Sequence, residues 1–267
     1  MYPHVHHQID QPILDVSNLS VHYEGRSALD DITFHLNAGL RVAVVGPNGA
    51  GKSTLFKVVA GVLPSNSGTV RVYGSGPGGH VCIAYLPQRS QVDWSFPVSV
   101  TDVVMMGRIA KLGWLGFPRK KDWDFVHTSL ETVGMDMHAK SQIGELSGGQ
   151  QQRMFIARAL AQEAELMLMD EPLTGLDSPS QEGLLTLLGD LQKKGVTVMV
   201  ATHDLEQASQ YFDRILLLNH RLIGFGKPND VLTPDNLLQA YSGKLSSVNG
   251  KVLTDTCCEG DEDAHRH

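Results

Sequence analysis

A glycine-rich segment, residues 46–54, is the clearest chemical motif of the sequence. It reads GPNGAGKST and follows the pattern G-x-x-x-x-G-K-[ST]. Glycines let such a loop wrap closely, so that backbone N–H groups and a helix N-terminus point at phosphate. The lysine brings a positive charge toward the β- and γ-phosphates, and the serine hydroxyl can ligate Mg²⁺. We therefore predict that ATP is bound by Gly46, Pro47, Asn48, Gly49, Ala50, Gly51, Lys52, Ser53 and Thr54.

Two adjacent carboxylates end an apolar segment farther along the chain. Asp170 and Glu171 follow Leu166–Met169. In phosphate-loop proteins the first such acid commonly holds the Mg²⁺ shell, and a second can orient the attacking water. Alone, this pair would be read as solvated acids at a strand end, but beside a phosphate loop it predicts Asp170 as a metal residue and Glu171 as a catalytic one.

A second anion-binding surface is predicted where another helix begins. The segment LSGGQ comprises Leu146, Ser147, Gly148, Gly149 and Gln150 and opens a helical stretch through Met154–Ala161. Free N–H groups and the positive end of the helix dipole favour phosphate there.

These motifs need a sheet to position them. Leu40–Val45, Leu166–Met169 and Val196–Ala201 are continuous apolar runs, typical of strands buried on both faces of a parallel sheet. Ile13–Val21 and Asp31–Leu36 alternate as half-buried antiparallel strands do, and Ile215–Leu218 with Leu222–Phe225 suggests a hairpin.

Helical spacing dominates between Pro97 and Gln162, which predicts a helical subdomain at about 97–162 inserted between central strands. Thr233 followed by Pro234 predicts a helix start. We expect a flexible N-terminus over 1–11, a nucleotide-binding domain over 12–246 and a disordered acidic tail over 247–267.

Composition limits the class of partner. The chain has 267 residues and a formal net charge of −7, so no basic field favours nucleic acid. Three cysteines are too few for a disulfide framework, and no secretory signal or membrane-spanning run is recognisable. We expect a cytosolic chain whose membrane role depends on a partner.

The order and spacing of Gly46–Thr54, Leu146–Gln150 and Leu166–Glu171 resemble the ATP-binding subunit of an ATP-binding cassette (ABC) transporter, over about Ile13 to Ser242. The resemblance implies an α/β P-loop NTPase (RecA-like) core with an N-terminal antiparallel β subdomain and an inserted α-helical subdomain. It also implies ATP hydrolysis coupled to transport, with ATP and Mg²⁺ as cofactors.

Further roles follow from the resemblance alone. Tyr23 resembles the aromatic residue that stacks on adenine, and Asp177 resembles a dimer-contact aspartate. Gln88 and His203 resemble the loop glutamine and the switch histidine that act with Glu171 in catalysis. Mg²⁺ would be held through Ser53, Gln88 and Asp170.

The resemblance implies a homodimer in which each phosphate loop faces the partner's LSGGQ segment. It also implies an integral-membrane permease, an indirect extracytoplasmic solute-binding protein, no nucleic acid, and a place on the cytoplasmic face of the cell membrane. The segment Trp94–Arg108 is expected to dock the permease, with Trp94 and Arg108 exposed.

The segment VDWSFPVSVTDVVMMGR is similar to the corresponding segment in ATPases of bacterial importers of manganese, zinc or ferrous iron. Among these, it resembles the ATPases of manganese importers most. A siderophore or cobalamin importer is the alternative within transport, and a non-transport ABC protein is the alternative outside it. His4, His6 and His7, or Cys257, Cys258, His265 and His267, could sense metal, but their spacing favours solvated tails.

Overall fold

A six-stranded, mostly parallel sheet forms the centre of the computed structural model, which describes residues 11–23, 25–76, 82–112, 116–241, 245–248 and 251–254. Its strand order is β5-β6-β7-β3-β8-β9, and only β9 is antiparallel to its neighbour. The strands are β3 (Arg41–Val45), β5 (Ile83–Leu86), β6 (Leu166–Asp170), β7 (Thr197–Thr202), β8 (Arg214–Asn219) and β9 (Arg221–Gly226).

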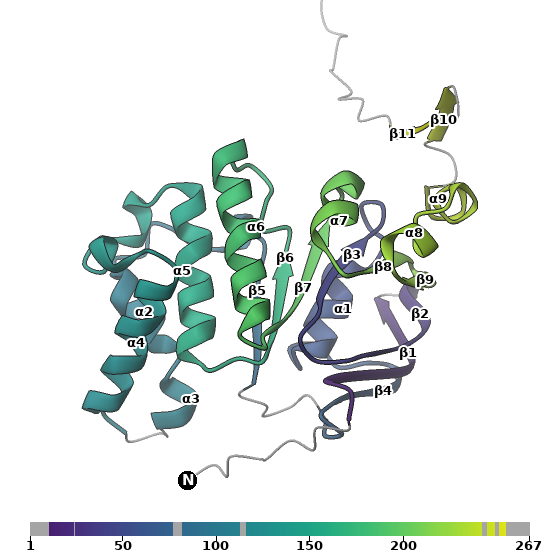
Figure 1. The fold of residues 1–267 in the computed structure, drawn as a ribbon. Helices are drawn as coiled ribbons and strands as arrows, with labels where there is room; N and C mark the ends of the chain where they lie inside the picture. Colours follow the sequence, from purple (N-terminus) through teal and green to yellow (C-terminus); the bar gives the residue numbers. More distant parts are fainter. Residues whose placement is uncertain are drawn as a thin grey trace, which may run out of the picture.

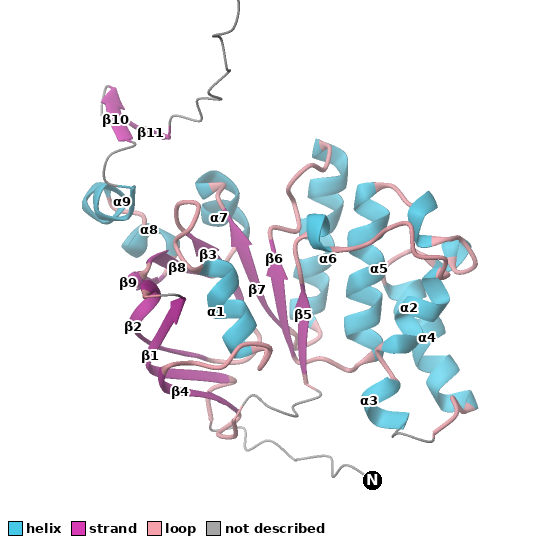
Figure 2. Ribbon diagram, turned by 180° about the vertical axis from the view of Figure 1, so that it is seen from behind, coloured by secondary structure: helices cyan, strands magenta, loops and turns pink. Residues whose placement is uncertain are grey.

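A second, antiparallel sheet has the order β2-β1-β4. It consists of β1 (Leu14–Tyr23), β2 (Arg26–Leu36) and β4 (Ser67–Val72). Alternating burial along β2 turns one face toward the core and the other toward solvent, as expected for a sheet with one wet face. In both views this sheet lies on the opposite side of the central sheet from the helical region (Figures 1 and 2).

The helical region is inserted between β5 and β6. It contains α2 (Val100–Met106), α3 (Ile109–Leu112), α4 (Lys120–Thr132) and α5 (Gly148–Ala161), with short 3-10 turns at Arg89–Gln91, Asp136–His138 and Ile143–Glu145. The remaining helices are α1 (Lys52–Val59), α6 (Ser178–Lys193), α7 (Leu205–Tyr211), α8 (Pro228–Val231) and α9 (Pro234–Tyr241).

The central sheet separates two apolar cores. One core joins α1 and the antiparallel sheet to one face, with Leu55 and Phe56 fully buried. The other joins α5, α6 and the helical region to the opposite face, with Met154 and Leu191 fully buried. Because α1 and α5 pack on opposite faces, the phosphate loop before α1 and the LSGGQ segment at the start of α5 belong to different layers.

This architecture confirms the predicted fold class. The long apolar runs became β3, β6 and β7, the alternating segments became β1 and β2, and the hairpin became β8 and β9. Sequence reasoning missed β4, whose first three residues are exposed, and β5, which is only four residues long. Such short or solvated strands carry too few apolar positions to show a period.

The expected terminal segments lie mostly outside the described residues, and so do His4, His6, His7, Cys257, Cys258, His265 and His267. The strand β10 (Leu245–Val248) begins just before the expected tail and pairs with β11 (Lys251–Thr254), which lies inside it. The sequence between these strands is Asn249-Gly250, a strong hairpin signal. No helix in the described part of the chain is long and apolar enough to span a bilayer.

The expectation that Arg108 is exposed is wrong. Its side chain is 4% exposed and pairs with Asp122 at 3.1 Å and Glu163 at 2.8 Å. The guanidinium also donates to the carbonyl of Ala161 and lies 4.2 Å from the ring of Phe125. A guanidinium with several donors can join three elements at once, so Arg108 belongs to the framework of the helical region.

We predict that Arg108→Met lowers the free energy of unfolding by about 3 kcal/mol, because it leaves the buried Asp122 carboxylate without its cation. Urea denaturation of the nucleotide-free chain measures this loss. Lys193→Met is the matched control, since the Lys193–Asp190 pair is exposed, at 77% and 55%, and the substitution should leave stability nearly unchanged. Equal losses in the two variants would contradict a structural role for Arg108.

Candidate functional site

The phosphate loop wraps tightly because two of its glycines meet backbone from other elements. A Cβ at Gly46 would overlap the carbonyl oxygen of Leu218 at the end of β8. Gly51 precedes α1 with a φ of 98°, and a Cβ there would overlap the carbonyl of Ala28 on β2. The loop is therefore seated between the central and antiparallel sheets.

Lys52 lies inside this loop. Its Nζ donates to the carbonyl oxygens of Gly46 at 2.7 Å and Pro47 at 3.0 Å, and the residue is 6% exposed. Burial lowers the pKa of the Lys52 amine, and the charges of Glu171 and Asp170 oppose that shift. The ammonium is thus desolvated and held by neutral carbonyls, an environment in which a phosphate would provide a strong additional partner.

The predicted metal residue, Asp170, is buried at the end of β6 and is 4% exposed. The hydroxyl of Ser53 donates to its carboxylate. Burial raises the pKa of Asp170, the bond from Ser53 opposes this, and the nearby charge of Glu171 adds to it. Its Oδ2 atom is buried and has no hydrogen-bond partner. The carboxylate therefore keeps an unused acceptor beside the phosphate loop.

Glu171 sits at a strained backbone position. Its φ is 50°, a left-handed value that costs a non-glycine residue about 1 kcal/mol. The bond from its N–H to the carbonyl of Ala201 at 3.1 Å holds this conformation. Gln88 Nε2 donates to Glu171 Oε2 at 3.2 Å, and Thr174 Oγ1 donates to the same oxygen at 3.4 Å. Two sequence-predicted catalytic residues, Gln88 and Glu171, are therefore in direct contact.

The strand order explains this convergence. Parallel strands β6, β7 and β3 are neighbours, and their carboxyl ends lead into Asp170–Glu171, His203 and the phosphate loop respectively. Ligands of open α/β sheets bind at this edge. His203 follows the last residue of β7 and is exposed. Tyr23 is exposed at the end of β1, where it pairs with Arg26 shortly before the β2 residues that contact Gly51.

The LSGGQ segment does not contact the phosphate loop of its own chain. Ser147 caps α5, accepting from the N–H of Gln150, while Gln150 Oε1 accepts from the N–H of Ser147 at 2.8 Å. Gly148 lies against Arg89 and Leu176, and Gly149 against Ser180. The segment is thus near Asp177, the exposed residue before α6, and on the far side of the central sheet from α1.

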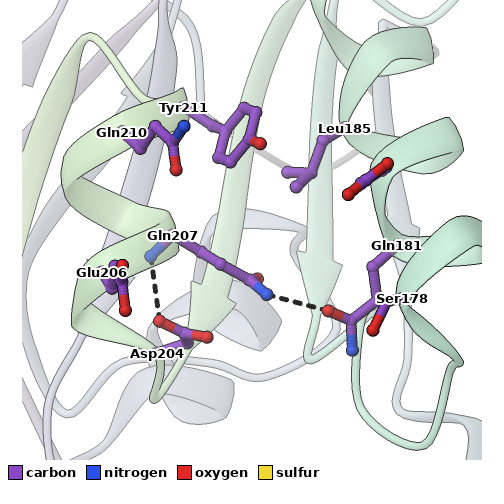
Figure 3. Close-up of a pocket in the computed structure, with 9 residues that line it drawn as sticks. Ser178, Gln181, Leu185, Asp204, Glu206, Gln207, Gln210 and Tyr211 are labelled. Atoms are coloured by element: carbon purple, nitrogen blue, oxygen red, sulfur yellow. Dashed lines mark hydrogen bonds between the residues drawn. The ribbon is translucent and has the colours of Figure 1, made fainter.

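A polar groove of about 270 Å³ lies between α6 and α7 (Figure 3). Gln207 bridges its two sides by donating to Gln181 at 2.8 Å, and the N–H of Gln207 donates to Asp204 at 2.9 Å. Its lining contains three carboxylates and no cation: Ser178, Gln181, Glu182, Leu185, Asp204, Glu206, Gln207, Gln210 and Tyr211. A phosphate would be repelled there, so the groove is not the nucleotide site.

Sequence reasoning missed three residues that shape the site. Thr174 contacts Glu171. Its position three residues after Glu171 could have indicated this contact from the sequence. Tyr85, on β5, has a buried hydroxyl beside Asp170. His220 donates its N–H to the carbonyl of Ala50 in the phosphate loop at 2.9 Å and accepts from the N–H of Asp30 at 2.8 Å. Nothing local in the sequence marks that long-range contact.

The chain matches known proteins along most of its length. A family model described as ABC transporter matches residues 29–174. The manganese transport system ATP-binding protein MntB of Bacillus subtilis is 45% identical over 91% of this chain and 97% of its own length. The zinc transport system ATP-binding protein TroB of Treponema pallidum is 45% identical over 88% of this chain and 89% of its own length.

Among solved structures, a chain of an inward-facing metal-chelate type ABC transporter superposes with a TM-score of 0.78. It is 31% identical, and the match covers 91% of this chain and 96% of the other.

We predict that Gly51→Ala lowers the melting temperature of the nucleotide-free chain more than Gly49→Ala does. Both positions have positive φ, which costs an alanine about 1 kcal/mol. Only at Gly51 does the added Cβ also meet the Ala28 carbonyl and the Leu29 side chain, whereas Gly49 has open space. Equal melting temperatures for the two variants would contradict the close packing of the loop on β2.

Proposed function

The chain belongs to the ABC transporter family, and on that premise we propose that it is the ATP-hydrolysing subunit of an importer that takes up a divalent metal ion, manganese in the first place. The observation that carries the choice of metal is the similarity over nearly the full length of both chains to a manganese transport ATP-binding protein. The equally identical zinc transport relative supports zinc as the second candidate.

The phosphate loop would hold the ATP phosphates. Its backbone N–H groups and the start of α1 supply oriented dipoles, and Lys52 supplies a positive charge that carbonyls now hold at 2.7 and 3.0 Å. Tyr23, exposed at the end of β1, would stack on the adenine ring.

The residues present fit Mg²⁺. The Asp170 carboxylate, the Ser53 hydroxyl that donates to it, and the amide oxygen of Gln88, whose Nε2 contacts Glu171, are hard oxygen donors, the ligand type that Mg²⁺ prefers. When bound, Mg²⁺ neutralises negative charge that develops on the phosphates. Asp170 and Ser53 would hold it, directly or through water.

Glu171 would orient and deprotonate the attacking water. Its carboxylate is kept in place by Gln88 and Thr174, and its strained backbone is fixed to β7. Gln88 would release Glu171 and turn toward the nucleotide when the site fills. His203, at the end of the neighbouring strand, would contact the γ-phosphate.

A second copy of the chain would complete each site. The LSGGQ segment offers free N–H groups at the start of α5, yet α5 packs on the opposite face of the sheet from α1. A head-to-tail homodimer resolves this separation, because the LSGGQ segment of one subunit then covers the phosphate loop of the other. Asp177, exposed just before α6 and near the LSGGQ segment, would line the same interface.

An integral-membrane permease would dock on the helical region, and through it the subunit would lie at the cytoplasmic face of the membrane. The segment from Trp94 to Arg108 supports this in part, since it leaves Phe96 and Met106 exposed. Trp94 is less available: its indole donates to the carbonyl of Arg89 at 3.1 Å, and its ring packs 5.7 Å from that of Phe155. A solute-binding protein would select the metal outside the cell.

We predict that Glu171→Gln binds ATP but hydrolyses it at least about 100-fold more slowly, because the amide cannot accept the proton of water. Gel filtration should then show a dimer with Mg-ATP and a monomer without nucleotide. Glu182→Gln, which changes an exposed carboxylate on α6, is the matched control and should behave as the unaltered chain. A monomer in both conditions would count against the shared site, and normal turnover would rule out the role of Glu171.

Uptake by vesicles that contain this subunit with its permease and binding protein tests the proposed cargo. We expect ATP-dependent accumulation of Mn²⁺ in preference to Zn²⁺ and Fe²⁺. Vesicles carrying Lys52→Ala are the control for coupling, because loss of the ammonium weakens the hold on the phosphates. Preferential uptake of Zn²⁺ would replace manganese by the second candidate, and ATP-dependent uptake of neither would contradict the proposal.

A further inference from the structure

Two buried polar atoms beside the phosphate loop lack partners, and one is the complement of the other. Neither the Tyr85 hydroxyl, a donor, nor Asp170 Oδ2, an acceptor, makes a hydrogen bond of standard length and angle in the nucleotide-free chain. Buried polar groups in native proteins are normally paired, because each unpaired group costs about 1–3 kcal/mol. A buried donor and a buried acceptor that lie close together can satisfy each other through one hydrogen bond.

The strand register places these groups on one face of the sheet. Tyr85 on β5 is the parallel partner of Leu168 on β6, and Asp170 lies two residues beyond Leu168. Side chains two residues apart on a strand share a face. Tyr85 packs against the core that lies between the central sheet, α1 and the antiparallel sheet. Its ring is therefore anchored in apolar surroundings while its hydroxyl lies diagonal to the carboxylate.

The electrostatics agree with this placement. Burial, and next the negative charge of Asp170, raise the pKa of Tyr85 to about 12. The phenol therefore stays protonated near neutral pH and remains a donor. Tyr241, on α9, provides a contrast, since its hydroxyl is also buried without a partner but its pKa is raised to about 12 by burial alone.

We propose that Tyr85 is a positioning residue of the nucleotide site, whose hydroxyl donates to Asp170 and fixes the orientation of that carboxylate. Ser53 donates to Asp170 in the nucleotide-free chain. On the proposed function, on which this step rests, the Ser53 hydroxyl would serve as a ligand of Mg²⁺ when Mg-ATP is bound and would no longer donate to Asp170. The Tyr85 hydroxyl then keeps the Asp170 carboxylate in the same orientation after the Ser53 donor is lost.

The first test is the thermal stability of the nucleotide-free chain, which does not depend on any activity. Tyr85→Phe should lower the melting temperature by about 3 °C or more, because it removes a donor to a buried charge. Tyr241→Phe is the matched control and should leave it unchanged or raise it, because it removes a hydroxyl that has no partner. An unchanged or higher melting temperature for Tyr85→Phe would overturn the hydrogen bond.

The second test is the Mg²⁺ dependence of binding of a fluorescent ATP analogue, measured in the Glu171→Gln background so that no turnover occurs. Tyr85→Phe should raise the half-saturating Mg²⁺ concentration about tenfold, the usual effect of losing an outer partner of a metal ligand, and leave Mg²⁺-free nucleotide affinity unchanged. Tyr241→Phe should change neither value. An unchanged Mg²⁺ dependence would overturn the positioning role.

The two tests separate this inference from the proposed function. If the unaltered chain and Glu171→Gln both fail to bind nucleotide, the ATPase proposal fails, while the melting comparison still decides whether Tyr85 bonds to Asp170. If nucleotide binds normally and Tyr85→Phe matches the parent in both measurements, the ATPase proposal stands and the role of Tyr85 is refuted.

Discussion

The close approach of backbone to backbone around the phosphate loop is the constraint on which the rest of the structure depends. Gly46 lies against the Leu218 carbonyl of β8, and Gly51 against the Ala28 carbonyl of β2. His220 joins the two supports by bonding to the loop on one side and to Asp30 of β2 on the other. The β8–β9 hairpin and the antiparallel sheet therefore help to hold the phosphate loop, although neither contains a motif residue apart from Tyr23.

A second consequence follows from the two-faced central sheet. The loop and α1 occupy one face, and the LSGGQ segment and α5 the other, so their N–H groups cannot meet one phosphate within one chain. Each chain carries two half-sites that are separated by its own core. On the proposed function, a head-to-tail dimer would bring the two half-sites of different chains together, and Asp177, which precedes α6 and lies near the LSGGQ segment, would lie at that contact.

The parts of the fold that the sequence predicted are those with long uniform signals. Val42–Val45 and Leu166–Met169 are apolar throughout because both faces of the sheet are covered, and this pattern needs no knowledge of partners. Tyr85 and Arg108 were not predictable in the same way. Tyr85 lies in a strand of four residues and Arg108 in the turn between α2 and α3. The carboxylates beside them are distant in the sequence: Asp170 follows Tyr85 by 85 residues, and Asp122 and Glu163 follow Arg108 by 14 and 55 residues.

The electrostatic state of the site favours a cation beside the proposed nucleotide. Asp170 and Glu171 are adjacent acids, and the charge of Glu171 adds to the effect of burial in raising the pKa of Asp170. Burial lowers the pKa of Lys52, and the negative charges of Glu171 and Asp170 oppose this shift. A bound triphosphate would compete for that ammonium and add negative charge beside Asp170. A divalent cation held by Asp170 would offset this repulsion, so on the proposed function the buried carboxylate, which is costly in the nucleotide-free chain, would be stabilised when Mg-nucleotide binds.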